Sequence, residues 1–159
     1  MAHFAELNSD NEVIRIIKID NIKNMTPEGI EDENVGLDYI KNDFGSDGTW
    51  KQCSYNTRGG ERYNPVTNVK EKTGTPFRAN YPCPGWIYDT TYGIFHEPRP
   101  TDKDGDSCAS FILDHTAGNW RPPITKPDDP AKPNDGPQQM YVWDESAYQA
   151  DNTKGWILV

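Results

Sequence analysis

The chain has 159 residues, and 25 Asp and Glu against 16 Lys and Arg give it a net charge of −9. This length suits one ordinary domain or two very small ones, and the acidic excess argues against a nucleic-acid partner, which needs clustered Lys and Arg. No stretch approaches the roughly 18 consecutive apolar residues of a membrane span, and the polar residues 1–11 predict neither a signal peptide nor a transit peptide. We therefore expect a protein that is made in a cytoplasm and has no membrane partner.

The supply of core residues is small. Leu, Ile, Val and Phe together make about 17% of the chain, which with the net charge falls in a range typical of disorder. The 5 Trp, 8 Tyr and 5 Phe argue against disorder, because aromatic side chains bury large areas in small β units. The 13 Gly and 13 Pro predict short elements and many loops. The expected fold class is therefore α+β, mostly β.

The first part of the chain predicts a β-β-α-β module over residues 1–57. His3–Leu7 and the β-branched run Val13–Ile19 flank the polar turn cluster Asn8–Asn11, which is the pattern of a hairpin. Strict alternation along the second strand places Val13, Arg15, Ile17 and Ile19 on one face and Ile14, Ile16 and Lys18 on the other. Both faces are largely apolar, so this strand is predicted to be central in its sheet.

One helix and one strand complete the predicted module. Residues 21–34 read as an acidic loop. From Leu37 to Phe44 apolar residues recur at close to helical spacing, and Gly45 suits the end of a short helix. Thr49–Tyr55 alternates with β-prone residues and predicts a third strand beside the hairpin.

The rest of the chain predicts a loop followed by small repeated hairpins. Residues 58–80 show little periodicity and predict an extended loop excursion, which in a compact domain is usually functional or ordered by a partner. Residues 81–159 carry an imperfect repeat, interrupted by a Pro-rich linker at 122–137. Three aromatic β-hairpins on Pro-rich connections are therefore expected.

Each copy of the repeat has the same internal logic. A short apolar strand leads to an Asp that can hydrogen-bond the turn backbone, and the returning strand carries an aromatic residue. This Asp and the aromatic residue lie 6 positions apart in the first two copies and 12 apart in the third, which predicts an insertion there. The predicted turn formers are Asp89, Gly93, Asp114, Gly118 and Asp144. The predicted hairpin anchors and interface residues are Trp86, Phe95, Phe111, Trp120, Tyr141, Trp143 and Trp156.

Motifs for metal binding or catalysis are weak. Asp102–Asp106 carries three aspartates, but glycine falls at the fourth position of the EF-hand loop and Leu113 stands where that loop needs Glu, which favours a solvated turn. His96 and His115 have no second ligand at metal-binding spacing, and no nucleophile or phosphate-loop motif is visible. We expect no metal, no cofactor and no enzymatic activity. Three widely spaced cysteines are expected to be free thiols: Cys53, Cys83 and Cys108.

The repeated aromatic residues allow two interpretations. An exposed platform on which sugar rings stack requires Trp86, Tyr92 and Tyr148 to be solvent-exposed and aligned. Alternatively, the aromatic side chains form the hairpins' own core, which the shortage of aliphatic residues favours.

Several short motifs also point to a family. They are His3–Leu7, Asp10–Asn11, Phe44–Gly45, Trp50–Gln52, Ser54–Asn56, Phe77–Tyr81, Gly85, Tyr88–Asp89, Trp120–Pro123 and Tyr141–Glu145. With the aromatic hairpin repeats, their order resembles a family of short virion structural proteins of tailed phages that infect marine and cyanobacterial hosts. The resemblance leaves out residues 59–75, residues 128–138 and the insertion in the third copy.

The resemblance implies a non-catalytic protein of the phage virion, made in the host cytoplasm, and it transfers no catalytic residues. Because isolated hairpins are at best marginally stable, we expect docking on other virion proteins of the capsid or tail, as a capsid decoration, fibre or baseplate component. Two alternatives stay open. One is a receptor-binding module of a tail fibre that contacts a host surface glycan, and the other is a tail-fibre assembly chaperone.

Overall fold

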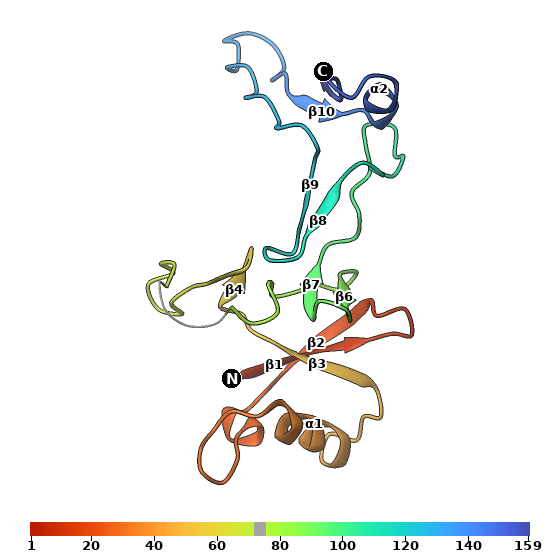
Figure 1. Cartoon of the computed structure of the whole chain (residues 1–159). Coiled ribbons are helices and arrows are strands. Elements are labelled where there is room, and N and C mark those ends of the chain that lie inside the picture. The colour runs from red at the N-terminus through yellow and green to blue at the C-terminus, as the bar shows by residue number, and fades with distance from the viewer. Residues whose placement is uncertain (72–75) are drawn as a thin grey trace. The chain divides into compact units, whose positions relative to one another are not determined.

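The computed structural model describes residues 1–71 and 76–159 (Figure 1). The architecture is α+β and mostly β, with small antiparallel sheets, as predicted. The chain forms two compact units, the first of Met1–Pro98 with His115–Asn119 and the second of Arg99–Asp114 with Trp120–Val159. The elements in chain order are β1 (Ala2–Leu7), β2 (Val13–Ile19), the 3-10 helix η1 (Asn21–Asn24), α1 (Glu33–Asn42), β3 (Thr49–Cys53), β4 (Thr57–Arg58), β5 (Glu61–Arg62), β6 (Ile87–Asp89), β7 (Ile94–His96), β8 (Ile112–Asp114), β9 (Asn119–Arg121), β10 (Tyr141–Trp143), α2 (Glu145–Ala150) and β11 (Trp156–Leu158).

The first unit is built on a three-stranded sheet in the order β2–β1–β3. Both outer strands run antiparallel to β1, so that Phe4 lies opposite Ile17 on one side and opposite Gln52 on the other. The prediction that Val13–Ile19 forms the central strand is therefore wrong. Its apolar pattern reflects a sheet that is covered on both faces, and this condition holds for an edge strand as well as for a central one.

A β-bulge also overturns the predicted alternation along β2. The register of β1 and β2 shifts near the start of β2, which leaves Ile14 as an extra residue in the ladder. As a result Val13 packs in the cluster on one face of the sheet, whereas Ile17 and Ile19 pack with the cluster on the other face.

Each face of the sheet has its own cover, and α1 and the β6–β7 hairpin lie on opposite sides of it in Figure 1. On the α1 side, the buried cluster consists of Ala2, Phe4, Ile19, Ile40 and Trp50. On the hairpin side, it consists of Ala5, Leu7, Val13, Cys53, Tyr88 and Phe95. The few aliphatic residues of the chain are thus supplemented by aromatic rings on both faces.

The helix of this unit begins earlier than predicted. It spans Glu33–Asn42, and Asp32 caps it by accepting the N–H of Asn34 at 2.8 Å. The segment 21–34, predicted as a loop, therefore contains η1 and the first two residues of α1. Gly45 adopts a φ of 76° just beyond the helix, as predicted.

Short ladders and turns occupy much of the predicted excursion over residues 58–80. β4 pairs with β5, and Tyr63 forms an isolated bridge with Lys70. The side chain of Asn64 closes the intervening turn by accepting two backbone N–H groups, at 2.9 and 3.0 Å. Residues 72–75 belong to this prediction but lie outside the described residues.

The three predicted hairpins are present as β6–β7, β8–β9 and β10–β11. In the first, Asp89 accepts two backbone N–H groups of the turn and Gly93 adopts a φ of 67°. In the second, Gly118 adopts a φ of 64° and Asp114 forms an ion pair with Arg121.

The insertion in the third hairpin is a helix. Asp144, predicted as a turn former, caps α2 by accepting the N–H of Ala147 at 2.8 Å. A helix forms here because Glu, Ala and Gln follow the capping Asp. Gly155 then lies against the indole of Trp143, where a β-carbon would clash with the ring.

The compact units divide the chain differently from the predicted segments 1–57, 58–80 and 81–159. The β6–β7 hairpin packs on the N-terminal sheet and belongs to the first unit, as does the turn His115–Asn119. A two-stranded hairpin cannot bury its aromatic residues alone, so it uses the apolar face of the neighbouring sheet. Among the helices described, none is long and apolar enough to cross a membrane.

Candidate functional site

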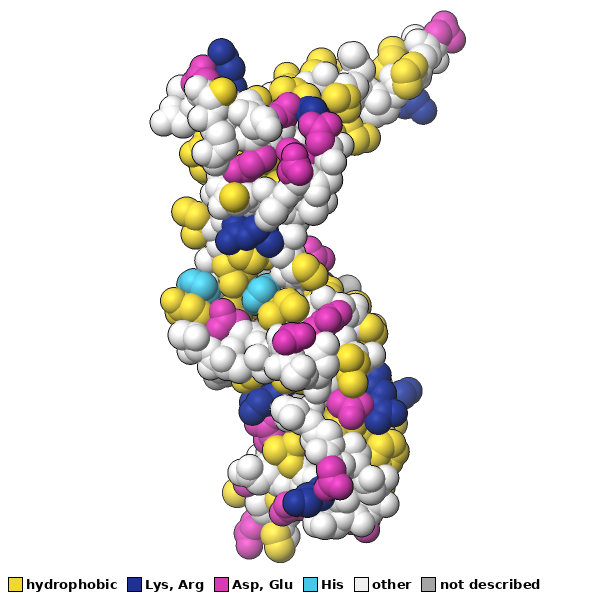
Figure 2. Space-filling view, turned by 90° about the vertical axis from the view of Figure 1, so that its right-hand side faces the viewer, with side chains coloured by type: hydrophobic (Ala, Val, Ile, Leu, Met, Phe, Trp, Pro, Cys, Tyr) yellow, Lys and Arg dark blue, Asp and Glu magenta, His cyan; other side chains and the backbone are white. Residues whose placement is uncertain are grey.

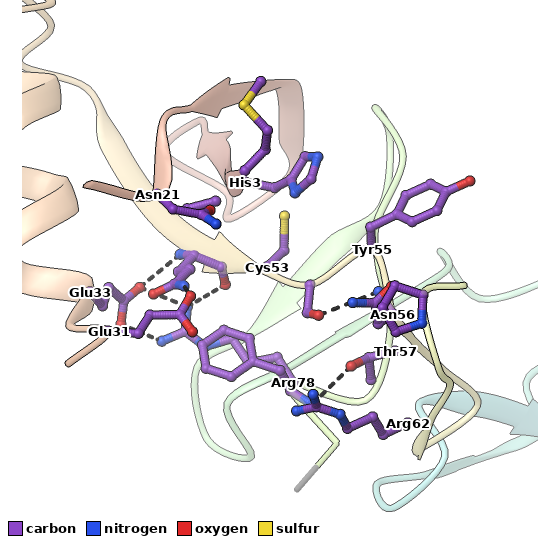
Figure 3. Close-up of a pocket in the computed structure, with 16 residues that line it drawn as sticks. His3, Asn21, Glu31, Glu33, Cys53, Tyr55, Asn56, Thr57, Arg62 and Arg78 are labelled. Carbon is purple, nitrogen blue, oxygen red and sulfur yellow. Dashed lines mark hydrogen bonds and ion pairs between the residues drawn. The ribbon is translucent and has the colours of Figure 1, made fainter. Parts of the chain in front are cut away.

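A groove of about 710 Å³ opens in the first unit beside β3 (Figure 3), a size within the range of ligand-binding clefts. Its walls come from β1, β3, the loop before α1 and the segments around β4 and β5. Ionisable and aromatic side chains in its lining include His3, Glu31, Glu33, Tyr55, Arg62 and Arg78.

An ion pair caps the outer edge of β3 at this groove. Arg78 donates from Nη1 and Nη2 to the two carboxylate oxygens of Glu33, at 2.8 and 2.7 Å. Oε1 of Glu33 also accepts the N–H of Gln52 at 2.7 Å, and Nη1 of Arg78 donates to the C=O of Gln52 at 2.8 Å. The pair therefore occupies two of the backbone groups through which a further strand would bind β3.

A second carboxylate extends this network toward η1. Oε1 of Glu31 accepts from Nε2 of Gln52 at 2.6 Å and from Nδ2 of Asn24 at 3.2 Å. Asn24 is fully buried and faces Gly36, where a β-carbon would clash with its Oδ1. The network thus holds η1, the loop before α1 and β3 together.

Burial and hydrogen bonding set the ionisation of the groove. Burial tends to raise the pKa of Glu33, but hydrogen bonds from Arg78 and from the backbone of Gln52 outweigh it and hold this pKa below its usual value. Burial raises the pKa of the Cys53 thiol to about 12, so it stays protonated at neutral pH. Burial also lowers the pKa of His3, with smaller contributions from the charges of the amino terminus and of Lys18. At neutral pH the ionised Glu33 is thus locked to Arg78.

The segment that supplies Arg78 is held in a rare backbone conformation. Arg78 and Ala79 have φ values of 55° and 61°, which residues other than glycine seldom adopt. The N–H of Asn80 donates to the C=O of Arg78 at 2.7 Å, which closes a tight γ-turn centred on Ala79. Such strain persists only where the surroundings fix the backbone, and here they do so on both sides.

Asn80 provides much of this fixation. Its side chain is buried, and its Nδ2 donates to the carbonyls of Phe95, Ala117 and Gly118 at 3.0, 3.1 and 3.2 Å. Its Oδ1 accepts the N–H of Gly59 at 2.7 Å. One amide therefore joins the loop after β4, strand β7 and the turn between β8 and β9.

We expect Arg78→Ala to destabilise the first unit by about 2 kcal/mol at pH 7, because the partly buried Glu33 and the C=O of Gln52 lose their donor. The depressed pKa of Glu33 stabilises the fold above the pKa of the unfolded carboxyl, about 4.5, and this contribution is lost as the pH falls through the folded value. The free energies of unfolding of the wild type and of Arg78→Ala, measured with a denaturant, should therefore differ less below about pH 4.5.

Arg78→Lys is the matched control, because it keeps the charge and loses the two-pronged geometry. The stability of the Arg78→Lys protein should lie between the stabilities of the wild type and of Arg78→Ala. A loss for Arg78→Ala that is independent of pH between 7 and 3 would contradict the role given to Glu33.

The predicted anchors of the first unit are core residues. Phe95 is fully buried and its ring centroid lies 5.0 Å from that of Tyr88. Trp86 is half-buried and packs at the margin of the same cluster.

The second unit has its own aromatic core around Trp143, which is 5% exposed. The ring centroids of Phe111, Tyr148 and Trp156 lie 5.2, 5.3 and 5.1 Å from it. Trp120 is half-buried beneath the guanidinium of Arg99, which lies 4.1 Å from its ring centroid. Tyr141, the remaining predicted anchor, is half-buried in β10.

Glu145 binds this core at the N–H edge of the Trp143 indole. Its carboxylate accepts from Nε1 of Trp143 at 2.9 Å, from Nε2 of Gln149 at 2.8 Å, and from both the N–H and the hydroxyl of Ser110 at 3.0 and 2.8 Å. Burial tends to raise the pKa of Glu145, but these hydrogen bonds outweigh it and hold the pKa below its usual value. Glu145 therefore stays ionised and fixes α2 to the core.

The aspartate run of this unit forms a turn. Oδ1 of Asp102 accepts the N–H groups of Asp104 and Asp106 at 2.9 and 3.0 Å, and Oδ2 accepts the N–H of Glu145. Within the described residues no group of three or more His, Cys, Asp or Glu side chains could hold a metal ion. The three cysteines are free, with Cys83 exposed and the other two buried.

The central residues of the groove were not predicted as site residues. Glu33 lies within the segment predicted as an acidic loop, and Arg78 lies at the end of the predicted excursion. Asn80, which does not line the groove but supports the backbone next to Arg78, belongs to the same excursion. Phe77–Tyr81 stood out only as a motif of the resemblance, with no role attached. The partners of Arg78 are 26 and 45 residues away, and local patterns carry no signal for contacts of that range.

Comparison of the chain with protein-family models, with curated proteins and with solved structures gives no match. The groove and the two cores are therefore interpreted from their own geometry.

Proposed function

We propose that this chain is a non-catalytic structural protein of a phage virion that docks on other virion proteins of the capsid or tail. The partly buried Glu33 and the buried Glu145 support this role because each is committed to hydrogen bonds that hold segments of the fold together. Acidic, basic and hydrophobic side chains are interspersed on the face shown in Figure 2, a mixture that suits contact with protein surfaces.

The open edge of β2 is the observation that carries the proposal. Since the backbone of Gln52 faces the capping ion pair, the opposite residue Phe4 directs its backbone groups toward β2. Alternation then turns the N–H and C=O groups of Ile16 and Lys18 away from β1. β2 ends the strand order of its sheet, and no strand in the described part of the chain covers these groups.

The uncovered part of the β2 edge begins just after Val13. The N–H of Val13 donates to the C=O of Trp86 at 2.7 Å, and its C=O accepts the N–H of Gly85 at 2.8 Å. From here the covering segment continues alongside the residues that precede β2, because Ile87 of β6 bridges Glu12 and the N–H of Tyr88 donates to the C=O of Asn11 at 2.9 Å. Among the described residues, no strand or backbone hydrogen bond covers the outer edge from Ile14, which is 50% exposed, to the end of β2.

The chemistry of this edge suggests the kind of strand that would bind it. Both charged residues of β2 are basic in a chain of net charge −9, and Arg15 pairs with Glu6 of β1. The part of the chain that the structure describes provides no ion-pair partner for Lys18. We infer that a strand of a neighbouring virion protein adds here, with an acidic side chain near Lys18 and apolar side chains beside the isoleucines.

Lys18→Pro tests this mode of docking. Proline removes the outward N–H without removing a bond to β1, so the unit should stay folded while its incorporation into particles falls about tenfold or more. Lys18→Ala is the matched control, because it removes the charge and keeps the N–H, and it should lower incorporation less. The amount of each variant in purified particles is measured by quantitative mass spectrometry.

The same measurement separates the structural role from the chaperone alternative. Stoichiometric wild-type protein in particles supports a structural part, whereas its absence from finished particles supports an assembly chaperone. Unchanged incorporation of a folded Lys18→Pro variant would refute docking through β2.

The hairpin platform for glycans fits the structure poorly. Trp86 packs against the core of the first unit, and Tyr148 packs on Trp143 in the second. Of the three residues that the platform requires, Tyr92 alone is more than half exposed, and its ring stacks on His115 at a centroid distance of 3.5 Å. The aromatic residues of the hairpins therefore serve mainly as core.

A further inference from the structure

We propose that the groove beside β3 binds a neutral oligosaccharide, a function separate from docking through β2. The hairpin platform does not provide this site. The residues that carry the proposal are Glu31, Tyr55, Asn56, Arg62 and Phe77, all of which line the groove of about 710 Å³.

The charged side chains of the groove balance one another, and this disfavours strongly charged ligands. They are two carboxylates, Glu31 and Glu33, and two guanidinium groups, Arg62 and Arg78, while His3 has a lowered pKa and Met1 adds the amino terminus. Arg78 is held by Glu33, and Arg62 donates from Nε to Glu71 at 2.7 Å. A phosphate or a nucleic acid would find no uncompensated cluster of positive charge here, whereas a neutral polyol needs none.

The polar atoms that remain suit hydroxyl groups, each of which donates and accepts one or more hydrogen bonds. Oε1 of Glu31 is used within the fold, and Oε2 has no hydrogen-bond partner among the described residues. Within the same described set, the side-chain amide of Asn56 and the Nη atoms of Arg62 also have no hydrogen-bond partner; Asn56 donates to Ser54 through its backbone N–H, and Arg62 donates to Glu71 through Nε. Among the described residues, free acceptors and free donors thus line the same groove.

Aromatic rings supply the apolar part of the site. Tyr55 is 72% exposed at the groove, and its ring is supported by an edge contact with Tyr81, whose centroid lies 5.4 Å away. Phe77 is half-buried in the same wall. A fixed and exposed ring offers the apolar face of a sugar a flat surface without the entropic cost of ordering a flexible side chain. In Figure 3, Tyr55 and Asn56 come from the segment that follows β3, while Glu31 lies across the groove.

The test is a glycan array that carries neutral and sialylated oligosaccharides, probed with the full chain. The strongest neutral oligosaccharide is then titrated by NMR against the wild type and two variants. Tyr55→Ala should weaken binding about tenfold or more, because the ring is part of the site. Tyr92→Ala is the matched control, since Tyr92 is also exposed in the first unit and does not line the groove. The affinity of Tyr92→Ala for the oligosaccharide should stay within about twofold of that of the wild type.

Three results would overturn the proposal: an array without signal above background, a preference for sialylated glycans, or equal losses for the two variants. Glu31→Gln adds a second readout, because it keeps the shape of the side chain and removes the charge of the free oxygen. Its binding should fall while the protein stays folded. Tyr55→Ala and Glu31→Gln leave the outer edge of β2 intact. A variant that loses glycan binding but is incorporated normally into particles therefore separates this site from the docking function.

Discussion

Asn80→Asp is expected to unfold the first unit or to reduce its stability by about 4 kcal/mol or more. The substitution keeps the shape of the side chain and replaces the amide that donates to three carbonyl oxygens with a carboxylate oxygen. A buried oxygen would then face the carbonyls of Phe95, Ala117 and Gly118, where both the lost hydrogen bonds and the repulsion are unfavourable. A loss of this size is a large part of the stability of an ordinary small domain.

Hydrogen exchange followed by mass spectrometry measures this effect in the first unit separately from the second. Asn134→Asp, at an exposed position of the Pro-rich linker, adds the same charge and should leave exchange unchanged. Asn80→Ala should fall between the wild type and Asn80→Asp, since it removes the donor without adding a charge. Equal protection of β7 in the wild type and in Asn80→Asp would show that the amide is dispensable.

Trp143→Ala is expected to cost the second unit about 3 to 5 kcal/mol, because the buried indole contacts three aromatic rings and donates to Glu145. Its removal would leave a cavity in the centre of this small core. It would also take one hydrogen bond from a buried carboxylate. Loss of protection in α2 and β11 by hydrogen exchange would record the effect.

Trp120→Ala is the comparison for this variant. Trp120 was predicted as an anchor of equal rank, but it is half-buried under Arg99, whereas Trp143 is buried. Its replacement should therefore cost less than half as much. Similar losses for the two variants would contradict the central position assigned to Trp143.

Local patterns in the sequence predicted the hairpins well. The turn before Gly93 depends on an Asp side chain that binds N–H groups two and three residues ahead, so all of its chemistry lies within a few positions. The insertion of the third hairpin was predicted by spacing, but its helical form was not, because an Asp side chain can accept backbone N–H groups both in a turn and at the start of a helix.

Features that depend on distant partners were missed. β2 was predicted as a central strand because its apolar residues occur on both faces, yet sheet order depends on which strand pairs with β1. Arg78 and Glu33 are 45 residues apart, and each alone is an ordinary charged residue. The capped and the open edge of one sheet could therefore be told apart only in the folded structure.

The contacts of Asn80 also constrain the order of events during synthesis. Most of the first unit is complete once residue 98 has been made, but two of the three carbonyls that hold Asn80 belong to Ala117 and Gly118. Until those residues leave the ribosome, the strained backbone at Arg78 and Ala79 lacks part of its support. The nascent first unit should therefore remain partly open while translation of the second is already under way, and its closure marks the point at which the β8–β9 turn has arrived.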